Sequence, residues 1–312
     1  MSLPSYLLRR AGGLVLVLLV TSFIVFGLLY LAPGSPLAFV LGPRGGSPEQ
    51  IAAVTAQYHL NDPFFVRYFR WLGDLVRGDL GHSIVYRQDV SDLIVTRLGT
   101  TAALVGLATI VIAVVGIGLG LIAALKGGLA DQIVNVVATL GLSTPVFVVG
   151  VALISVFSVV PGSLTTNGSG SGGLDTLIHL FLPAVALAVA SSAYLARITR
   201  ASVLEEKGRE HVQTSVARGL SSGVTIRRHV LRNALIPITT VMGLTIATLI
   251  AGAVVIENVF ALDGLGSLLV RAIMQRDFAV VQAVIVAFVV VNAIVDFLYT
   301  LIDPRISLGS KQ

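Results

Sequence analysis

The amino-acid sequence predicts an all-α integral membrane protein with six transmembrane helices. Of its 312 residues, 55% are hydrophobic and 12% are charged, whereas soluble proteins carry about 25% charged residues. The mean hydropathy is +0.92, and uncharged stretches long enough to cross a bilayer recur along the chain. These observations exclude a cytoplasmic enzyme, a nucleic-acid-binding protein and a disordered chain, so no nucleic acid is expected as a partner.

The uncharged stretches set the number of helices. A transmembrane helix needs about 20 mostly apolar residues, because each residue rises about 1.5 Å through a hydrocarbon core about 30 Å thick. The predicted spans cover approximately residues 10–32, 98–125, 132–160, 176–198, 235–257 and 278–302. Residues 161–174 are also uncharged, but their glycine- and serine-rich sequence predicts a loop.

Lysine and arginine residues place both termini in the cytoplasm. With the N-terminus inside, the inner segments contain Arg9, Arg10, Lys126, eight basic residues from Arg197 to Arg232, Arg305 and Lys311. The short outer loops contain none at 161–175 and two, Arg271 and Arg276, before the last span. The other six outer basic residues lie in the long segment 44–97, and long loops weigh less in the positive-inside rule. The first apolar stretch is too long for a signal peptide and no small-x-small cleavage site follows it, so it predicts an uncleaved anchor.

Residues 34–97 are predicted to form a large extracytoplasmic segment between the first two spans. Ser47-Pro48-Glu49 is a helix start, with serine as the N-cap and proline in the first turn. A second helix follows Pro63, and one face of it is apolar: Phe64, Tyr68, Trp71, Leu72 and Leu75. Arginines at 67, 70 and 77 suit this helix to an interfacial or partner-facing position. Packing on the outer rim is favoured over contact with substrate.

The predicted cytoplasmic segment 199–234 contains most of the functional signal. The net charge of the chain is +5, and residues 197–232 contain eight basic and three acidic residues, which account for the whole surplus. Contact with lipid headgroups explains the charge. It does not explain the small residues and the glycines at 208, 219 and 223, which are expected to break the segment into short helices. This composition predicts a surface shaped to fit another protein.

The chain lacks the residues that would bind ATP or a metal. Its only lysines, Lys126, Lys207 and Lys311, precede Gly, Gly and Gln, so there is no phosphate-binding loop with a Gly-Lys-Ser/Thr ending. There are no cysteines, and the five histidines lack metal-ligand spacing. The sequence therefore predicts no catalytic residue, no metal site and no cofactor site in this chain.

Polar residues in the last span leave alternatives open. An ionisable group inside a span is a functional candidate, and Asp296 lies there with Asn292 one turn away on the same face. A secondary transporter more typically has several such groups, which favours a structural role for this pair. An ATP-independent secondary transporter or channel of six helices remains the alternative. An intramembrane hydrolase using His179 is a more distant one.

Motifs along nearly the whole chain resemble those of one transporter family. They are Pro33-Gly34-Ser35-Pro36, Leu60-Asn61-Asp62-Pro63, Gly78-Asp79-Leu80-Gly81-x-Ser83, Thr144-Pro145-x-Phe147, Leu182-Pro183-Ala184, Glu257-Asn258-Val259-Phe260, Gly264-Leu265-Gly266, Arg276-Asp277 and Asp303-Pro304-Arg305. The chain resembles the permease subunits of ATP-driven (ABC) importers of the peptide/nickel class, specifically the B-type permease of dipeptide and oligopeptide systems. The resemblance implies a type I ABC importer permease fold.

The most specific resemblance lies in the cytoplasmic segment. Its residues resemble the coupling loop with which such permeases dock in a cleft of the ATPase subunit. The site residues implied are Glu210, Thr214, Ala217, Arg218, Gly219, Leu220, Arg228, His229, Arg232, Asn233 and Pro237. Small residues such as Ala217 and Gly219 permit close approach, while Arg218 and Glu210 can pair across an interface.

The resemblance also implies a complex and a location. The chain would pair with a homologous C-type permease, with two ATPase subunits or one fused ATPase that hold ATP and Mg, with an extracytoplasmic substrate-binding protein, and with membrane lipid. It would lie in a bacterial plasma (inner) membrane as a multi-pass protein. The cargo would be dipeptides or oligopeptides, or a related solute such as glutathione, a nickel chelate or haem.

Overall fold

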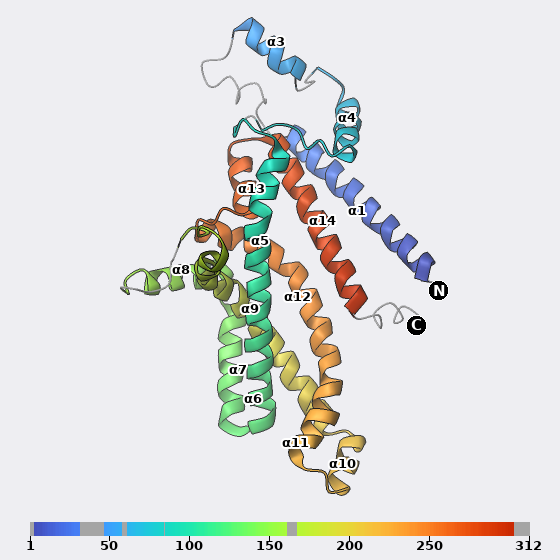
Figure 1. Ribbon diagram of the computed structural model, residues 1–312, viewed down its shortest axis with the longest axis vertical. Helices are drawn as coiled ribbons and strands as arrows, with labels where there is room; N and C mark the ends of the chain where they lie inside the picture. Colours follow the sequence, from blue (N-terminus) through green and yellow to red (C-terminus); the bar gives the residue numbers. More distant parts are fainter. Residues whose placement is uncertain (1–2, 32–46, 58–60, 84, 161–166, 303–312) are drawn as a thin grey trace. The chain divides into compact units, whose positions relative to one another are not determined.

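The computed structural model describes residues 3–31, 47–57, 61–83, 85–160 and 167–302, and the named elements in these ranges are all helices (Figure 1). The contacts group them into two compact units. Unit 1 contains Met1–Gly99 and Ser267–Ile294, and unit 2 contains Thr100–Gly266 and Val295–Gln312. The motifs at 33–36 and 303–305 and the predicted loop residues 161–166 lie outside the described residues.

Unit 1 contains the N-terminal helix, the predicted extracytoplasmic helices and the last long helix. Its elements are α1 (Leu3–Leu31), α3 (Pro48–Gln57), α4 (Phe64–Val76), the start of α5 (Val90–Ile112), most of α13 (Leu265–Met274) and most of α14 (Phe278–Ile302). The predicted helix start at Ser47 is confirmed. The carbonyl oxygen of Ser47 accepts a hydrogen bond of 2.9 Å from the amide of Ile51, which closes the first turn.

Helix α4 packs on α1 through the apolar face that the sequence predicts. The Tyr68 hydroxyl is buried and lies 3.0 Å from the Ser22 hydroxyl, within hydrogen-bond distance. The Tyr68 ring meets Phe23 edge-on at 5.2 Å between centroids, and Trp71 lies 6.0 Å from Phe26. Edge-to-face aromatic pairs of this kind are stabilising beyond the area they bury. The contacts fix this face of α4 against α1.

Two of the sequence motifs in unit 1 meet although they lie far apart in the chain. Asp277, at the start of α14, is buried and accepts hydrogen bonds from the Ser83 hydroxyl at 2.5 Å and from the Val85 amide at 3.2 Å. A buried carboxylate needs such donors because it has lost its hydration. The Gly81-x-Ser83 motif and the Arg276-Asp277 motif are therefore two halves of one polar contact.

Unit 2 is organised around a long central helix. Its elements are the end of α5, the π-helical turn η1 (Ala113–Ile117), α6 (Gly118–Lys126), α7 (Gly128–Ser143), α8 (Val146–Phe157), α9 (Gly173–Lys207), α10 (Glu210–Ala217), α11 (Ser222–Thr225), the π-helical turn η2 (Ile226–Leu231) and α12 (Arg232–Val259). Helix α9 packs against α6, α7, α8 and α12. The apolar core of the unit therefore lies along α9, with Leu180, Leu195 and Val203 fully buried.

Glycines let the η1–α6 segment approach α9 closely. A Cβ on Gly120 would lie 2.6 Å from the Ala196 carbonyl oxygen, and one on Gly116 would lie 2.9 Å from the Leu195 Cβ. Gly118, between them, faces open space. Small residues four apart on a helix commonly let membrane helices pack closely. The hydrophobic effect does not drive helices together within lipid, so their association depends on van der Waals contact.

Two arginines of α9 bind α7 rather than another molecule. The Arg200 guanidinium donates two hydrogen bonds to the Asp131 carboxylate in a bidentate ion pair. Arg197 donates to the Thr139 hydroxyl at 2.6 Å. Planar bidentate pairs of this type fix orientation as well as distance. Part of the basic surplus that the sequence shows in this region is therefore used inside unit 2.

A buried glutamate explains the two glycines of the Gly264-Leu265-Gly266 motif. Glu257 is fully buried and accepts a hydrogen bond of 2.6 Å from the Thr101 hydroxyl, which in turn accepts one of 2.8 Å from the Leu265 amide. A Cβ on Gly264 would overlap the Glu257 carboxyl group, and one on Gly266 would lie 2.5 Å from the Val254 backbone. The glycines at these two positions leave room for the buried carboxylate.

The predicted third span, 132–160, is not one continuous helix. Helices α7 and α8 meet at an angle of 104°. Thr144, between them, is extended (φ −91°, ψ 122°) because it precedes Pro145, which disfavours helical backbone at the preceding residue. Pro145 then starts α8 as its N-cap. Pro145, which lies within the predicted span, therefore marks a sharp bend.

The described residues contain four helical stretches long and apolar enough to cross a membrane: Val90–Lys126, Gly173–Lys207, Ser222–Val259 and Phe278–Val295. The bent α7–α8 pair would be a fifth if it forms one span. Helix α1, at the first predicted span, has 29 residues and includes the apolar stretch Gly12–Leu28. An all-helical membrane protein is therefore confirmed, with four to five candidate spans among these residues.

Candidate functional site

The segment that connects α9 to α12 contains the predicted coupling residues, and it forms one end of unit 2 (Figure 1). Helix α9 ends at Lys207, and α10 follows after Gly208 and Arg209. The predicted breaks at Gly208 and Gly219 are confirmed. The predicted break at Gly223 is wrong, because this glycine lies within α11, which runs without interruption into η2 and α12. Pro237 lies inside α12.

Three of the predicted residues share one exposed face of α10. Glu210, Thr214 and Ala217 follow one another at spacings of four and three, which places them on one side of a helix, and all three are exposed. The opposite side of α10 faces the chain itself, where Val212 and Ser215 are each 6% exposed. The helix therefore has an anchored side and a free side.

A glycine turn ends α10. The amide of Gly219 donates to the Val216 carbonyl oxygen at 2.9 Å, and the amide of Leu220 donates to the Ser215 carbonyl oxygen at 3.3 Å. These two bonds are those of a Schellman motif, which requires a left-handed residue at its turn. Gly219 has φ +79° and supplies that conformation. A Cβ at this position would meet nothing within 4 Å, so this side of the turn faces open space.

Large apolar side chains are exposed around this turn. Val216 is 59% exposed, Leu220 41% and Val224 38%. Exposed apolar groups that gather in an otherwise polar segment typically mark an interaction site. Arg218, Arg227, Arg228 and Arg232 are exposed in the same segment. Apolar and basic side chains are therefore both exposed in this segment, and we call Glu210, Thr214, Val216, Ala217, Gly219, Leu220 and Val224 the tip surface.

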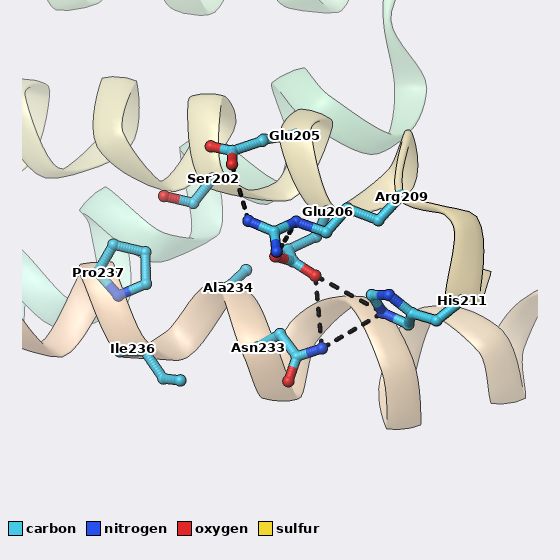
Figure 2. Close-up of a pocket in the computed structure, with 9 residues that line it drawn as sticks. All are labelled: Ser202, Glu205, Glu206, Arg209, His211, Asn233, Ala234, Ile236 and Pro237. Carbon is cyan, nitrogen blue, oxygen red and sulfur yellow. Dashed lines mark hydrogen bonds and ion pairs between the residues drawn. The ribbon is translucent and has the colours of Figure 1, made fainter. Parts of the chain in front are cut away.

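A cluster of polar side chains ties the segment to both long helices (Figure 2). Glu206, at the end of α9, is 8% exposed. Its carboxylate forms an ion pair with Arg209, whose Nε lies 2.8 Å from Oε1, and accepts a hydrogen bond of 3.4 Å from Asn233 Nδ2, in α12. His211 Nε2, in α10, lies 3.7 Å from Glu206 Oε2 and 3.3 Å from Asn233 Nδ2. These side chains, which we call the Glu206 cluster, join α9, α10 and α12.

The Glu206 cluster borders a polar pocket of about 490 Å³ (Figure 2). The lining residues come from the end of α9, the start of α10 and the start of α12: Ser202, Glu205, Glu206, Arg209, His211, Asn233, Ala234, Ile236 and Pro237. Of the predicted residues, Asn233 and Pro237 lie here rather than at the tip surface. His229 is half-buried, with its ring 6.4 Å from that of His211.

The polar residues predicted in the last span are only partly described. Asn292 lies in α14, and its Oδ1 atom is buried without a hydrogen-bond partner among the described residues. The side chain of Asp296 lies outside them. His179 Nδ1 lies 2.9 Å from the Asp175 carbonyl oxygen, one turn earlier in the same helix. Within the described part of the chain, no three His, Cys, Asp or Glu side chains are placed to hold a metal ion.

Two family models match the chain. Residues 116–308 match the family described as "binding-protein-dependent transport system inner membrane component", and residues 3–105 match the N-terminal part of such a membrane component. The first match alone covers more than half of the chain. The chain belongs to this family. The family predicted from the sequence motifs is therefore confirmed, and the protein is a multi-pass permease of the bacterial inner membrane rather than a catalytic subunit.

Named relatives match the permease over nearly its whole length. A probable peptide ABC transporter permease protein, y4tP, of Sinorhizobium fredii is 38% identical over 309 residues, which cover 96% of this chain and 98% of the relative. The glutathione transport system permease protein GsiC of Escherichia coli K12 is 35% identical over 307 residues, which cover 97% of this chain and 98% of the relative. The permease is therefore a component of an ABC transporter complex.

Solved structures share the fold of the permease. A crystal structure of an amino acid ABC transporter matches with a TM-score of 0.55 at 17% identity, over 69% of this chain and 94% of that chain. An inward-facing structure of the MetNI methionine ABC transporter matches with a TM-score of 0.55 at 20% identity, over 67% and 94%. At these identities the likeness concerns the fold, which is that of an ABC importer permease.

The Glu206 cluster predicts that Glu206 contributes more to the stability of the permease than its neighbour Glu205. Glu206→Ala leaves the donors of Arg209 and Asn233 without their buried acceptor, and we expect it to lower the free energy of unfolding by about 1–3 kcal/mol. Glu205, with its side chain 70% exposed, pairs with Arg209 at the surface, and Glu205→Ala is expected to cost less than about 1 kcal/mol. Thermal unfolding of the purified variants in detergent measures both. Equal losses would contradict the role of the cluster.

Proposed function

We propose that the tip surface docks on an ATP-hydrolysing partner and that this contact drives import through the permease. The single observation that carries the proposal is the exposed tip surface, where Val216 and Leu220 surround a glycine turn. Contact with lipid headgroups accounts for the basic residues of the segment, but not for its small residues or for the exposed glycine turn. An apolar centre with a charged rim is the usual anatomy of a protein–protein interface.

The Glu206 cluster provides the physical link between the tip surface and the membrane helices. Because its carboxylate holds Arg209, His211 and Asn233 together, a displacement of α10 is passed to the ends of both α9 and α12. When the ATPase subunits close on ATP, α10 moves with them and the two long helices move as rigid bodies. Rigid-body shifts of packed helices are a common form of switching in transport proteins.

The proposal includes a membrane topology. Six helices cross the membrane, namely α1, the α5–α6 stretch, the bent α7–α8 pair, α9, the stretch from Ser222 to Val259, and α14. Both termini and the tip surface are cytoplasmic, and residues 34–97 are extracytoplasmic. The charge distribution supports this orientation, since the loop at 161–175 has no basic residue while residues 197–232 have eight.

The proposal also includes partners and a cargo. The permease pairs with a homologous C-type permease to form the channel, with two ATPase subunits or one fused ATPase, and with an extracytoplasmic substrate-binding protein. The relatives are named for peptide and for glutathione transport, and glutathione is itself a short peptide. We therefore assign the permease to the import of dipeptides or other short peptides.

Uptake into proteoliposomes tests the proposed function. The permease is reconstituted with its partner permease and ATPase, and uptake of a labelled dipeptide is driven either by ATP or by an ion gradient. Uptake that requires ATP and the binding protein is the expected result. Uptake that persists without the ATPase and disappears with the ion gradient would instead establish the secondary transporter.

A further inference from the structure

Helix α4 has an apolar arc wider than the face that α1 covers. Phe64 and Tyr68 pack on α1, but the neighbouring positions remain exposed: Phe65 is 62% exposed, Phe69 64% and Val76 82%. Phe65, Phe69 and Val76 are spaced by four and seven residues, so they form one row along the helix. We call this row the α4 strip.

The α4 strip continues an exposed apolar surface of α1. The Phe65 ring is stacked on Phe23 of α1, with centroids 6.4 Å apart and an interplanar angle of 20°. Phe23 is itself 40% exposed, and it extends a series of exposed apolar residues on α1 that includes Leu16, Val20 and Ile24. Both helices belong to unit 1. If the α1 surface faces lipid, lipid therefore also reaches the strip.

The charges of α4 lie away from the strip. Arg70 and Arg77 are exposed and project from the other side of the helix, where Arg70 pairs with Asp62 at 2.6 Å. An amphipathic helix with aromatic residues on one side and arginines on the other is the form that lies in the plane of a membrane interface. Aromatic rings are enriched at this depth because they are apolar but tolerate headgroup dipoles.

We propose that α4 is an interfacial helix that binds the phospholipid surface of the outer leaflet through Phe65, Phe69 and Val76. This inference rests on the proposed topology, in which α4 follows the outer end of α1. The strip enters the boundary between headgroups and acyl chains, and the arginines remain at the phosphate level. The helix thereby holds the outer end of α1 against the bilayer.

Tryptophan fluorescence tests the proposal, because Trp71 is the only tryptophan of the chain. In a Trp71→Phe background, a reporter is introduced by Phe69→Trp on the strip or by Arg70→Trp at the neighbouring polar position. The permease is reconstituted in phosphatidylglycerol/phosphatidylethanolamine vesicles with phospholipids brominated close to or far from the headgroup. Phe69→Trp should lose most of its emission to shallow bromines and little to aqueous iodide, while Arg70→Trp should show the reverse.

A second reporter keeps the test decisive if one variant does not fold. Val76→Trp lies on the same strip one turn beyond Leu72 and should behave like Phe69→Trp. Quenching of both strip reporters by iodide alone would overturn the proposal. Iodide quenching that disappears only when the substrate-binding protein is added would also overturn it, and would assign the strip to that protein. The measurement uses neither ATP nor the ATPase, so its failure leaves the transport proposal standing.

Discussion

Replacing Gly219 with leucine abolishes ATP-driven uptake and leaves the amount of permease in the membrane unchanged. The glycine has φ +79° in an exposed turn with no neighbour near its Cβ position. In the proposed docking, a leucine there projects from the tip surface and prevents the ATPase from approaching Ala217 and Leu220. Loss of a central interface contact typically costs at least about 2 kcal/mol, which corresponds to a loss of affinity of roughly 30-fold.

The leucine variant also strains the turn, and a control separates the two effects. A side chain in the left-handed region costs about 1–2 kcal/mol, but asparagine occupies the same helix-ending position in other proteins. We therefore expect Gly219→Asn to retain most of the uptake. Uptake by Gly219→Leu at the wild-type rate, with normal retention of the ATPase on purification, would contradict docking at this turn.

Replacing Gly120 with alanine strongly destabilises unit 2. A Cβ at this position meets the Ala196 carbonyl oxygen at 2.6 Å, and backbone atoms cannot rotate away as side chains can. Overpacking a core by one methyl group typically costs about 1–3 kcal/mol and sometimes more. We expect the upper end of this range, with a large loss of the monodisperse fraction in size-exclusion chromatography and a lower unfolding temperature in detergent.

Gly118 provides the matched control for this prediction. It lies in the same helix two residues away, and a Cβ there meets nothing within 4 Å. Alanine is favoured over glycine in a helix by about 1 kcal/mol, so Gly118→Ala is expected to be neutral or slightly stabilising. Equal unfolding temperatures for the two alanine variants would contradict the close packing of α6 on α9 at Gly120.

The sequence predicts local features of this permease well because their causes are local. Ser47 and Pro48 favour a helix start through their own capping and backbone preferences, and the spacing of Phe64, Tyr68 and Trp71 places them on one helical face. The bend at Pro145 also has a local cause, although this proline lies inside a single predicted span. The angle between α7 and α8 depends on packing, which the sequence does not display.

Contacts between distant segments could not be predicted in the same way. Ser83 and Asp277 are 194 residues apart, and each looks like an ordinary polar residue near a helix end. Gly116 and Gly120 are two of 32 glycines in the chain. Their spacing is the available signal, but only the structure shows that α9 is the helix that they meet.

The candidate site was predicted in part. The family resemblance identified Glu210, Thr214 and Ala217, and helical spacing explains why they share an exposed face. It also included Asn233 and Pro237, which lie at the pocket instead. Glu206 and Val216 were missed, because the burial of a glutamate and the exposure of a valine both depend on how the segment folds back onto α9 and α12.

The absence of cysteine from the chain allows the most direct test of docking at the tip surface. Thr214→Cys, on the exposed face of α10, is labelled with a photoreactive maleimide, and Ser215→Cys, on the buried face, serves as its neighbour control. The permease complex is irradiated and the adducts are identified by mass spectrometry. We predict that Thr214→Cys forms an adduct with the ATPase and that Ser215→Cys does not. Labelling of Thr214→Cys at the same rate with and without the ATPase, together with no ATPase adduct, would contradict the account.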